Sequence, residues 1–269
     1  MTSDFEPMKF IQPLAGRQIV VTRPGGQAEH LATLLVAQGA EPVFFPVFSI
    51  QPCADITPVM EAAIALDSFD LAVFVSPNAI EKALDIILPR RAWPAHLPCI
   101  VLGKMSEQAL HQRGMSRVIS PALQFDSEAL LALPELMAVA GKRIIIFRGD
   151  TGRELLGDTL TQRGAVVQRV ACYRRLPTNA DASVLLKRWE AGALDAVTLT
   201  SSEGLRYFFD RVGHLGQAWL KKTPTFVTHQ RIAAQALALG LKQVIPTAPG
   251  DDGLIKELMQ YYVHHGTRQ

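Results

Sequence analysis

The sequence predicts an α/β fold with two similar domains, each with a parallel sheet flanked by helices, and three observations support it. Short apolar runs alternate along the chain with segments of helical spacing, a pattern typical of α/β proteins. Residues 143–177 hold one complete unit, in which an apolar run is followed by turn residues, a helical segment and a second extended segment. The same unit occurs near the start of the chain. We therefore expect a fold built from a duplicated βαβ arrangement.

The duplication has a constant offset. Arg23 and Arg148 each end an apolar run, and each precedes a glycine, Gly39 or Gly164, by 16 residues. The two copies are 125 residues apart (148 − 23). The same offset aligns further segments, namely 69–80 with 194–205, 100–106 with 225–231, and 119–121 with 244–246. One offset that holds over several segments indicates an ancient duplication of about half the chain.

The first copy begins with a predicted strand at residues 18–22, because this apolar run ends at Pro24 and Gly25. A helix is expected at 25–38, before Gly39. Pro46 interrupts the extended segment that follows. Further strands are predicted at 71–75, 99–102 and 118–119, and further helices at 59–66, 76–88, 104–112 and 127–133. Residues 1–16 are expected to form a loose leader.

The second copy repeats this order. Its apolar run at residues 144–147 is typical of a strand that is buried on both faces of a parallel sheet. Leu155, Leu156 and Leu160 lie at helical spacing, and the following extended segment closes at Pro177. The remaining strands are predicted at 196–200, 225–227 and 243–245, and the remaining helices at 182–190, 202–212, 230–239 and 250–263.

Two extended segments, residues 41–52 and 165–177, are equivalent under the offset, and both are longer than an ordinary strand. Each could leave one domain and enter the other. Domain one would then hold residues 1–46 plus 178–269, domain two would hold 54–168, and 47–53 and 169–177 would be linker strands. A simple cut near residue 130 is the alternative.

The composition excludes several classes of protein. Hydrophobic residues make up 48% of the 269 residues and charged residues 19%, so the chain can bury a core and is not a disordered protein. A net charge of +2, with no run of Lys or Arg, gives no support to a nucleic-acid partner. The cysteines are scattered singly, which indicates neither a zinc site nor a disulfide framework. No apolar run is long enough for a membrane span, and a reducing, cytoplasmic location is expected.

Candidate binding residues follow the predicted strands, where open parallel sheets bind their ligands. Backbone N–H groups at helix N-termini bind anions there, and hydroxyl, amide, guanidinium and ammonium groups can assist. The alternative for each Ser or Thr is that it only caps a helix. The candidates for substrate binding are Arg23, Ser76, Asn78, Gly103, Lys104, Ser106, Arg148, Gly149, Thr200, Ser201, Ser202 and Thr228.

Signatures of common enzyme classes do not occur. The chain has no GxGxxG after a strand, no GxxxxGK[ST], no GxSxG and no HExxH. Asp70 and Asp195 are expected to hydrogen-bond turns before their strands and to have no catalytic role. Tyr173 is the candidate catalytic residue, because its equivalent in the first copy is Phe48, so that one copy carries an added hydroxyl. The alternative is a half-buried structural tyrosine with a satisfied hydroxyl.

Several of these motifs, taken in order, resemble those of the uroporphyrinogen-III synthase family. They are the VTRPGG run from Val21 onward, Phe45-Pro46, the FVSPN run from Phe74 onward, Arg148-Gly149 with the RELL run from Arg153 onward, Gly164-Ala165, Cys172-Tyr173-Arg174-Arg175, and the segment 197–201. The resemblance covers about residues 17–258. The chain departs from the family pattern after the strand at 225–227, where Thr228 and Arg231 stand in place of a glycine and a threonine.

The resemblance implies two α/β domains joined by a two-stranded linker that the chain crosses twice. It also implies a lyase of the hydro-lyase type, which needs no metal or other cofactor. Such an enzyme closes hydroxymethylbilane, a linear tetrapyrrole polycarboxylate, to uroporphyrinogen III with loss of water and inversion of ring D. It serves tetrapyrrole biosynthesis, which leads to haem, sirohaem and cobalamin.

The expected partner is this small molecule, which the preceding pathway enzyme could hand over, with no nucleic acid, no membrane and a monomeric chain. A two-domain binding protein for a polyanionic small molecule is the main alternative, and it needs no proton donor. A sugar-nucleotide glycosyltransferase is a second alternative, but no acidic residue is placed to hold a ribose.

Overall fold

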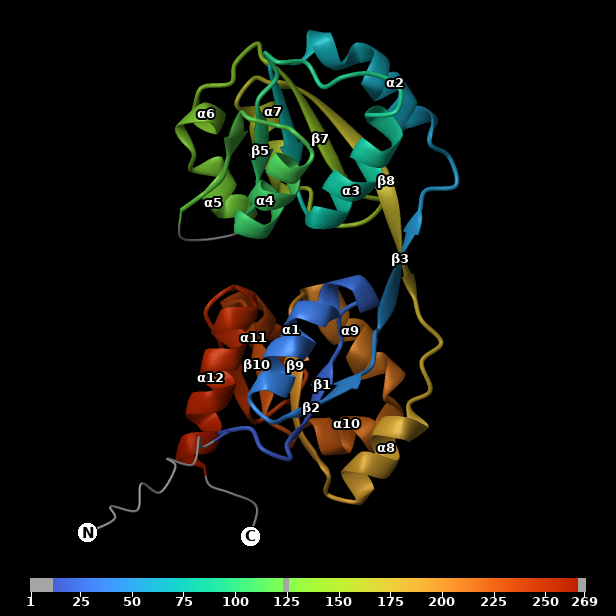
Figure 1. The fold of residues 1–269 in the computed structure, drawn as a ribbon, viewed down its shortest axis with the longest axis vertical. Coiled ribbons are helices and arrows are strands. Elements are labelled where there is room, and N and C mark those ends of the chain that lie inside the picture. Colours follow the sequence, from blue (N-terminus) through green and yellow to red (C-terminus); the bar gives the residue numbers. More distant parts are fainter. Residues whose placement is uncertain (1–11, 123–125, 266–269) are drawn as a thin grey trace, which may run out of the picture. The chain divides into compact units, whose positions relative to one another are not determined.

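The computed structural model describes residues 12–122 and 126–265, and the chain forms two compact units (Figure 1). Unit 1 consists of residues 1–49 and 177–269, and unit 2 of residues 50–176, as far as these are described. The chain therefore leaves unit 1 once and returns once, and neither unit is a contiguous half of the sequence. Most of the leader predicted at residues 1–16 lies outside the described residues, while Leu14 is buried in the core of unit 1.

Unit 1 contains a parallel sheet with the strand order β11-β10-β9-β1-β2. Helices α1 and α12 cover one face of this sheet, and helices α8, α9, α10 and α11 lie on the other face. The elements, in chain order, are β1 (Gln18–Val21), α1 (Gly25–Ala37), β2 (Glu41–Phe44), α8 (Ser183–Glu190), β9 (Leu194–Leu199), α9 (Ser202–Arg211), α10 (Gly213–Leu220), β10 (Thr225–Val227), α11 (Gln230–Ala238), β11 (Val244–Pro246) and α12 (Gly250–His264).

Unit 2 contains a second sheet with the strand order β3-β8-β7-β4-β5-β6. Helices α2, α3 and α4 pack on one face of this sheet, and α5, α6 and α7 pack on the other. The elements are β3 (Phe48–Pro52), α2 (Thr57–Ala65), the 3-10 turn η1 (Leu66–Ser68), β4 (Leu71–Phe74), α3 (Pro77–Ile87), β5 (Cys99–Val101), α4 (Lys104–Gln112), β6 (Val118–Ile119), α5 (Ser127–Leu131), α6 (Pro134–Met137), β7 (Arg143–Gly149), α7 (Leu155–Gln162) and β8 (Val166–Pro177).

Five strands of the unit 2 sheet repeat the order of the unit 1 sheet, and β3 is an additional strand at its edge. In unit 1, Val20 of β1 lies between Val43 of β2 and Val197 of β9. In unit 2, the residues 125 positions away have the same arrangement, with Ile145 between Gln168 and Ala72. The first β-strand and helix of one copy thus join the later strands of the other copy in both units. The predicted α/β class with parallel sheets is confirmed.

The offset of 125 does not hold to the end of the repeat. Ala72 pairs with Cys99, whereas its equivalent Val197 pairs with Thr225, so the copies are 126 residues apart from β5 and β10 onward. One extra residue in the second copy, between β9 and β10, accounts for this shift. The sequence alignments of residues 100–106 with 225–231 and of 119–121 with 244–246 were therefore wrong by one position, and the first of these matters for the candidate site.

Two small features recur in both copies and hold the β-strands in place. Gly39 and Gly164 follow α1 and α7 with φ angles of 82° and 87°, a left-handed conformation that favours glycine after a helix. Asp195 accepts a hydrogen bond from the backbone N–H of Gln18 at 2.8 Å, and Asp70 accepts one from Arg143 at 2.8 Å. Both aspartates therefore accept backbone hydrogen bonds as predicted, but the N–H belongs to the start of the neighbouring strand and not to the turn before their own strand.

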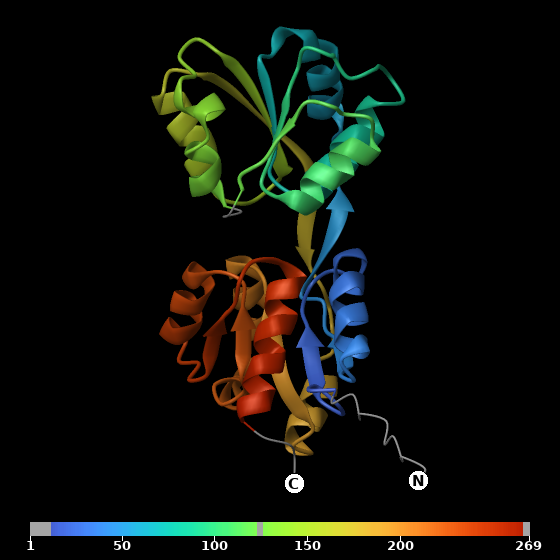
Figure 2. The same ribbon diagram turned by 60° about the vertical axis from the view of Figure 1, so that its left-hand side comes forward.

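The two long extended segments differ in the structure. Residues 41–52 break into β2, which belongs to the sheet of unit 1, and β3, which lies beside β8. Residues 166–177 form one unbroken strand, which runs opposite to β3 (Figure 2). Pro46 explains the difference, because it lacks the N–H that its counterpart Ala171 can donate to a neighbouring strand. Where the chain returns to unit 1, the backbone N–H of Thr178 donates to the carbonyl of Val47 at 3.2 Å.

Candidate active site

The carboxyl edge of the unit 2 sheet carries a helix N-terminus and a tyrosine in direct contact. Ser76 follows β4 and caps α3, because its Oγ accepts a hydrogen bond from the backbone N–H of Ala79 at 3.1 Å. The Oη of Tyr173, on β8, lies 3.1 Å from the same Oγ. The structure thus brings together Ser76 and Tyr173, two predicted site residues that are 97 positions apart in the chain.

Tyr173 is more deeply buried than the sequence indicated. Only 1% of its surface is exposed, and its ring packs in the core on the α3 face of the sheet. Gly149, its neighbour on β7, makes this possible, because a Cβ at that position would come within 2.9 Å of two ring carbons. Position 149 therefore requires glycine because the tyrosine ring comes so close to its backbone.

Arg175 is a third member of this cluster, and the sequence analysis did not include it among the site residues. Its guanidinium lies 5.8 Å from the centre of the Tyr173 ring, and its Nη2 donates to the Tyr173 Oη at 3.4 Å. The spacing in the sequence could have revealed it, because residues two apart on a strand point to the same face. The cluster is therefore a serine hydroxyl, a tyrosine hydroxyl and a guanidinium in a row.

Arg148 ends β7 at the same edge and is paired with exposed carboxylates. Its Nη1 lies 2.8 Å from an oxygen of Glu154, whose side chain is 55% exposed and also pairs with Arg169 at 3.3 Å. Arg153 forms a second pair nearby, with two bonds to Glu128 of 2.6 and 2.9 Å. Because the carboxylates of both pairs are about half exposed, an anionic ligand can compete with them for these arginines.

The turn after β5 holds the remaining candidates of unit 2. Gly103 precedes α4, and Lys104 in its first turn binds Glu107 at 2.9 Å. Ser106 is buried within that turn, and Asn78 is buried in the first turn of α3. Ser120 donates to the same oxygen of Glu107 at 2.6 Å, and this bond together with Lys104 lowers the pKa of that carboxyl below its usual range. Lys104 and Gly103 remain suited to an anion, whereas Ser106 and Asn78 are not exposed to one.

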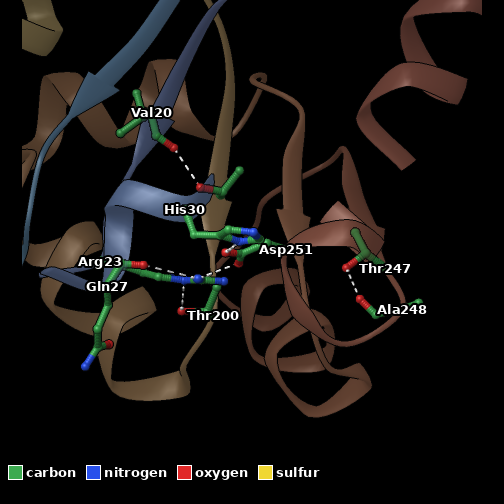
Figure 3. A network of polar contacts seen from close by, with 9 residues as sticks. Val20, Arg23, Gln27, His30, Thr200, Thr247, Ala248 and Asp251 are labelled. Atoms are coloured by element: carbon green, nitrogen blue, oxygen red, sulfur yellow. Dashed lines mark hydrogen bonds and ion pairs between the residues drawn. The ribbon is translucent and has the colours of Figure 1, made fainter. Parts of the chain in front are cut away.

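In unit 1 the equivalent arginine, Arg23, is held by a buried carboxylate (Figure 3). Its Nη1 lies 2.5 Å from an oxygen of Asp251, whose side chain is 3% exposed, and its Nε donates to Thr200 at 3.3 Å. The other oxygen of Asp251 lies 2.9 Å from the Nδ1 of His30. Asp251 stands in the first turn of α12, where a negative charge is favourable. This network fixes Arg23 more firmly than Arg148 is fixed.

The other candidates of unit 1 are helix caps and their neighbours. Ser201 caps α9 by accepting from the N–H of Gly204 at 2.9 Å, as Ser76 does in unit 2. Ser202 accepts from the Nε of Arg231 at 3.5 Å. The corrected alignment shows that His229, which caps α11, is the counterpart of Gly103. Thr228 lies one residue before the cap, so the predicted match of Thr228 with Gly103 was wrong.

Each of these edges, taken by itself, offers neutral hydrogen-bond donors, helix N-termini and a guanidinium group, which suit carboxylate groups of an anionic ligand. Within residues 12–122 and 126–265 no three His, Cys, Asp or Glu side chains gather in a way that could hold a metal ion. Burial raises the pKa of Cys99 and of Cys172 to about 12, so both thiols stay protonated and are poor nucleophiles. In the described part of the chain no helix is both long and apolar enough to cross a membrane.

Comparison with solved structures supports the fold. The chain superposes on a crystal structure of a mutant uroporphyrinogen III synthase from the extremely thermophilic bacterium Thermus thermophilus with a TM-score of 0.62 and 16% identity, covering 93% of this chain and all of that one. It also superposes on uroporphyrinogen-III synthetase from Helicobacter pylori 26695 with a TM-score of 0.56 and 12% identity, covering 91% of this chain and 99% of that one. At such low identity these likenesses establish the fold alone.

Sequence comparison establishes the family. The chain is 32% identical to the uroporphyrinogen-III synthase of Escherichia coli (strain K12) over 243 residues, which cover 89% of this chain and 99% of that protein. It is 32% identical to the enzyme of the same name from Synechococcus elongatus over 215 residues, or 77% of this chain and 80% of that protein. The family model described as uroporphyrinogen-III synthase HemD matches residues 29–256. The chain therefore belongs to the uroporphyrinogen-III synthase family.

Proposed function

We propose that this chain closes hydroxymethylbilane to uroporphyrinogen III, with loss of water and inversion of ring D. The reaction makes the chain a lyase of the hydro-lyase type in tetrapyrrole biosynthesis. The observation that carries the proposal is the family match over residues 29–256, together with the 32% identity to the Escherichia coli enzyme along nearly its whole length. The donors at the edges of the two sheets agree with a polycarboxylate substrate.

Each unit supplies its own set of contacts for substrate carboxylates. In unit 2 the N-termini of α3 and α4 offer backbone N–H groups, and Lys104 and Arg148 offer positive charge. In unit 1 the N-terminus of α9 does the same at Ser201, with Thr200, Ser202 and Arg23 beside it. Within either unit, carboxylates that bind such groups restrict the conformations of the linear tetrapyrrole, which favours ring closure over reactions in solution.

The chemical step needs a proton donor, because hydroxide is a poor leaving group. Tyr173 is the proposed source of that proton, since a tyrosine hydroxyl keeps its proton at neutral pH and can give it up to a developing negative charge. The short distance to Ser76 and the positive charge of Arg175 both support this assignment. The carbon–oxygen bond breaks as the oxygen takes up the proton, and water leaves.

The resemblance to the family also supports the remaining parts of the proposal. The chain would act without a metal or other cofactor, as a monomer in the cytoplasm, and could receive its unstable substrate from the preceding pathway enzyme. The substrate contacts named above are all supplied by side chains and backbone groups of the chain itself.

The test is an assay of the purified protein with freshly made hydroxymethylbilane, after exhaustive chelation and without any nucleotide. We expect rapid formation of the type III isomer, whereas closure without the enzyme gives the isomer in which ring D is not inverted. Tight binding of the tetrapyrrole without any acceleration would favour the alternative, a binding protein for a polyanionic small molecule. Loss of turnover on chelation, with recovery on adding a metal ion, would contradict the proposed cofactor-free reaction.

A further inference from the structure

The hydroxyl of Tyr173 is not accessible to a ligand in the structure. The residue is 1% exposed, and its Oη points at the capping hydroxyl of Ser76, 3.1 Å away. Ser76 is partly exposed and stands at the start of α3, on the edge of the sheet where a substrate would bind. The exposed end of this pair is therefore the serine, and the tyrosine lies behind it.

The direction of the hydrogen bonds follows from the groups involved. A guanidinium only donates, so the contact between Arg175 Nη2 and Tyr173 Oη places a donor on the tyrosine oxygen. The tyrosine proton is then free to point at Ser76 Oγ. That oxygen already accepts from the N–H of Ala79, and accepting from Tyr173 as well uses its second lone pair. The proton of Ser76 is left to donate outward.

We infer that Ser76 delivers the proton to the leaving hydroxyl of the substrate, and that Tyr173 and Arg175 form a relay behind it. This inference rests on the proposed function and deepens it, because it names the group that touches the reacting oxygen. Ser76 is then the catalytic residue in contact with substrate, Tyr173 is the buried proton source, and Arg175 is a positioning residue that offsets the charge developing on the tyrosine oxygen.

Each proton that the relay gives to the leaving group is regained from the substrate later in the reaction. The carbon–oxygen bond of the hydroxymethyl group breaks, its electron pair leaves with the oxygen, and the proton of Ser76 Oγ completes a water molecule. The proton of Tyr173 moves to Ser76, and the phenolate that forms is balanced by the guanidinium of Arg175. The methylene carbon freed in this way bonds to the bridged carbon of ring D, the bond from that ring carbon to its old bridge breaks, and the bridge then bonds to the unsubstituted carbon of ring D, which inverts the ring. This last carbon releases one proton, which restores the phenol.

Comparison of the two copies indicates that the cluster of Ser76, Tyr173 and Arg175 does more than cap a helix. Ser201 caps α9 with the same geometry, yet the position equivalent to Tyr173 is Phe48 and the position equivalent to Arg175 is Ile50. The ring of Phe48 lies beside the N-terminus of α9, where a Cβ on Gly204 would meet it at 3.7 Å. Capping alone therefore works with an apolar ring in this place, and of the two copies only the second carries the hydroxyl and the guanidinium.

The experiment compares Ser76→Gly, Tyr173→Phe and the double variant in turnover of hydroxymethylbilane. Glycine is tolerated at the position that caps a helix, so Ser76→Gly removes the hydroxyl with little loss of the cap. We expect each single variant to lose turnover by roughly tenfold to a hundredfold, the low end of what a positioned general acid contributes. The double variant should lose little more than either single one, because both residues act in one relay.

Two further measurements separate the relay from a structural role. Ser76→Thr keeps both the cap and a hydroxyl and should retain most of the turnover, whereas Ser201→Gly removes the matched cap of unit 1 and should cost less than Ser76→Gly. Turnover would also be measured in mixtures of light and heavy water. For the wild type, a plot of turnover against the deuterium fraction should be curved, because two protons move. For Tyr173→Phe the same plot should be a straight line. Arg175→Gln should lower kcat with little change in KM.

Full turnover by Ser76→Gly, together with a loss in Tyr173→Phe, would overturn the relay and place the tyrosine itself on the substrate. Losses that multiply in the double variant would overturn it as well, since the two hydroxyls would then act independently. Both outcomes leave the proposed function intact, because the wild type still forms the type III isomer. A wild-type protein that forms no type III isomer would refute the proposed function and the relay with it.

Discussion

The two units have sheets of equivalent strand order, but residues at equivalent positions have different partners. Arg23 in unit 1 is held by Asp251, a carboxylate that is almost fully buried, whereas Arg148 in unit 2 is held by the exposed Glu154. The aromatic residue beside the capping serine is Phe48 in one copy and Tyr173 in the other. Duplication supplied two similar frameworks, and the proposed proton chemistry arose in one of them while the other kept a rigid ion pair.

The largest expected difference between the units is in stability. Asp251→Ala leaves Arg23 mostly buried without its charge partner, and we expect a loss of about 3 kcal/mol, the low end for breaking a buried pair because Arg23 retains some access to water. Glu154→Ala removes a carboxylate that is 55% exposed and hydrated, so it should cost less than Asp251→Ala, although the Arg148 side chain, at 12% exposed, is as buried as that of Arg23. Urea unfolding of the two variants measures both values. Equal losses would show that the burial of the carboxylate does not distinguish the two ion pairs.

A second comparison concerns the glycine under the tyrosine ring. Gly149→Ala places a methyl group 2.9 Å from Tyr173, and we expect a loss of about 1–3 kcal/mol from overpacking, together with lower turnover. Gly26→Ala in α1 of unit 1 is the matched control, because no atom lies within 4 Å of the added carbon. It should stabilise the chain by up to about 1 kcal/mol. Retention of full turnover by Gly149→Ala would argue that the position of the tyrosine ring is not important.

The smallest expected effect is the pH dependence of stability that Glu107 of unit 2 contributes. The bond from Ser120 and the charge of Lys104 lower the pKa of Glu107 from 4.5, so this carboxyl stabilises the folded state when it is ionised. The contribution is fully present above pH 4.5 and is lost as the pH falls through the lowered value. Glu107→Gln should therefore be slightly less stable than wild type at neutral pH, and the two should converge in acid. A difference that persists or grows in acid would contradict this assignment.

The sequence predicted the order of the elements well because the apolar runs and the turn glycines repeat at a fixed offset. It did not predict helix α10, since Gly213 and Gly216 are typical of a break in a helix. It also matched Thr228 with Gly103, because one extra residue in the second copy shifts the register where no apolar run marks the change. An alignment by residue type alone cannot detect such a shift.

For the site, the sequence identified the serine, the tyrosine and both arginines, but not their partners. Asp251 and Arg23 are 228 positions apart (251 − 23). The sequence around either residue does not indicate that the two side chains form an ion pair. The burial of Tyr173 depends on the lack of a side chain at Gly149 on the neighbouring strand. Contacts of this kind arise from tertiary packing, so the exposed end of the proposed relay could not be assigned before the fold was known.

The most direct test of the central difference between the copies is to exchange their aromatic residues. Turnover of hydroxymethylbilane to the type III isomer would be measured for Tyr173→Phe, for Phe48→Tyr, and for the variant that carries both changes. We expect Tyr173→Phe to lose roughly tenfold to a hundredfold, the low end for a general acid, and the exchanged variant to remain as low, because the position equivalent to Arg175 is Ile50 in the first copy. Full turnover in Tyr173→Phe, or recovery in the exchanged variant, would contradict the assignment of proton transfer to unit 2.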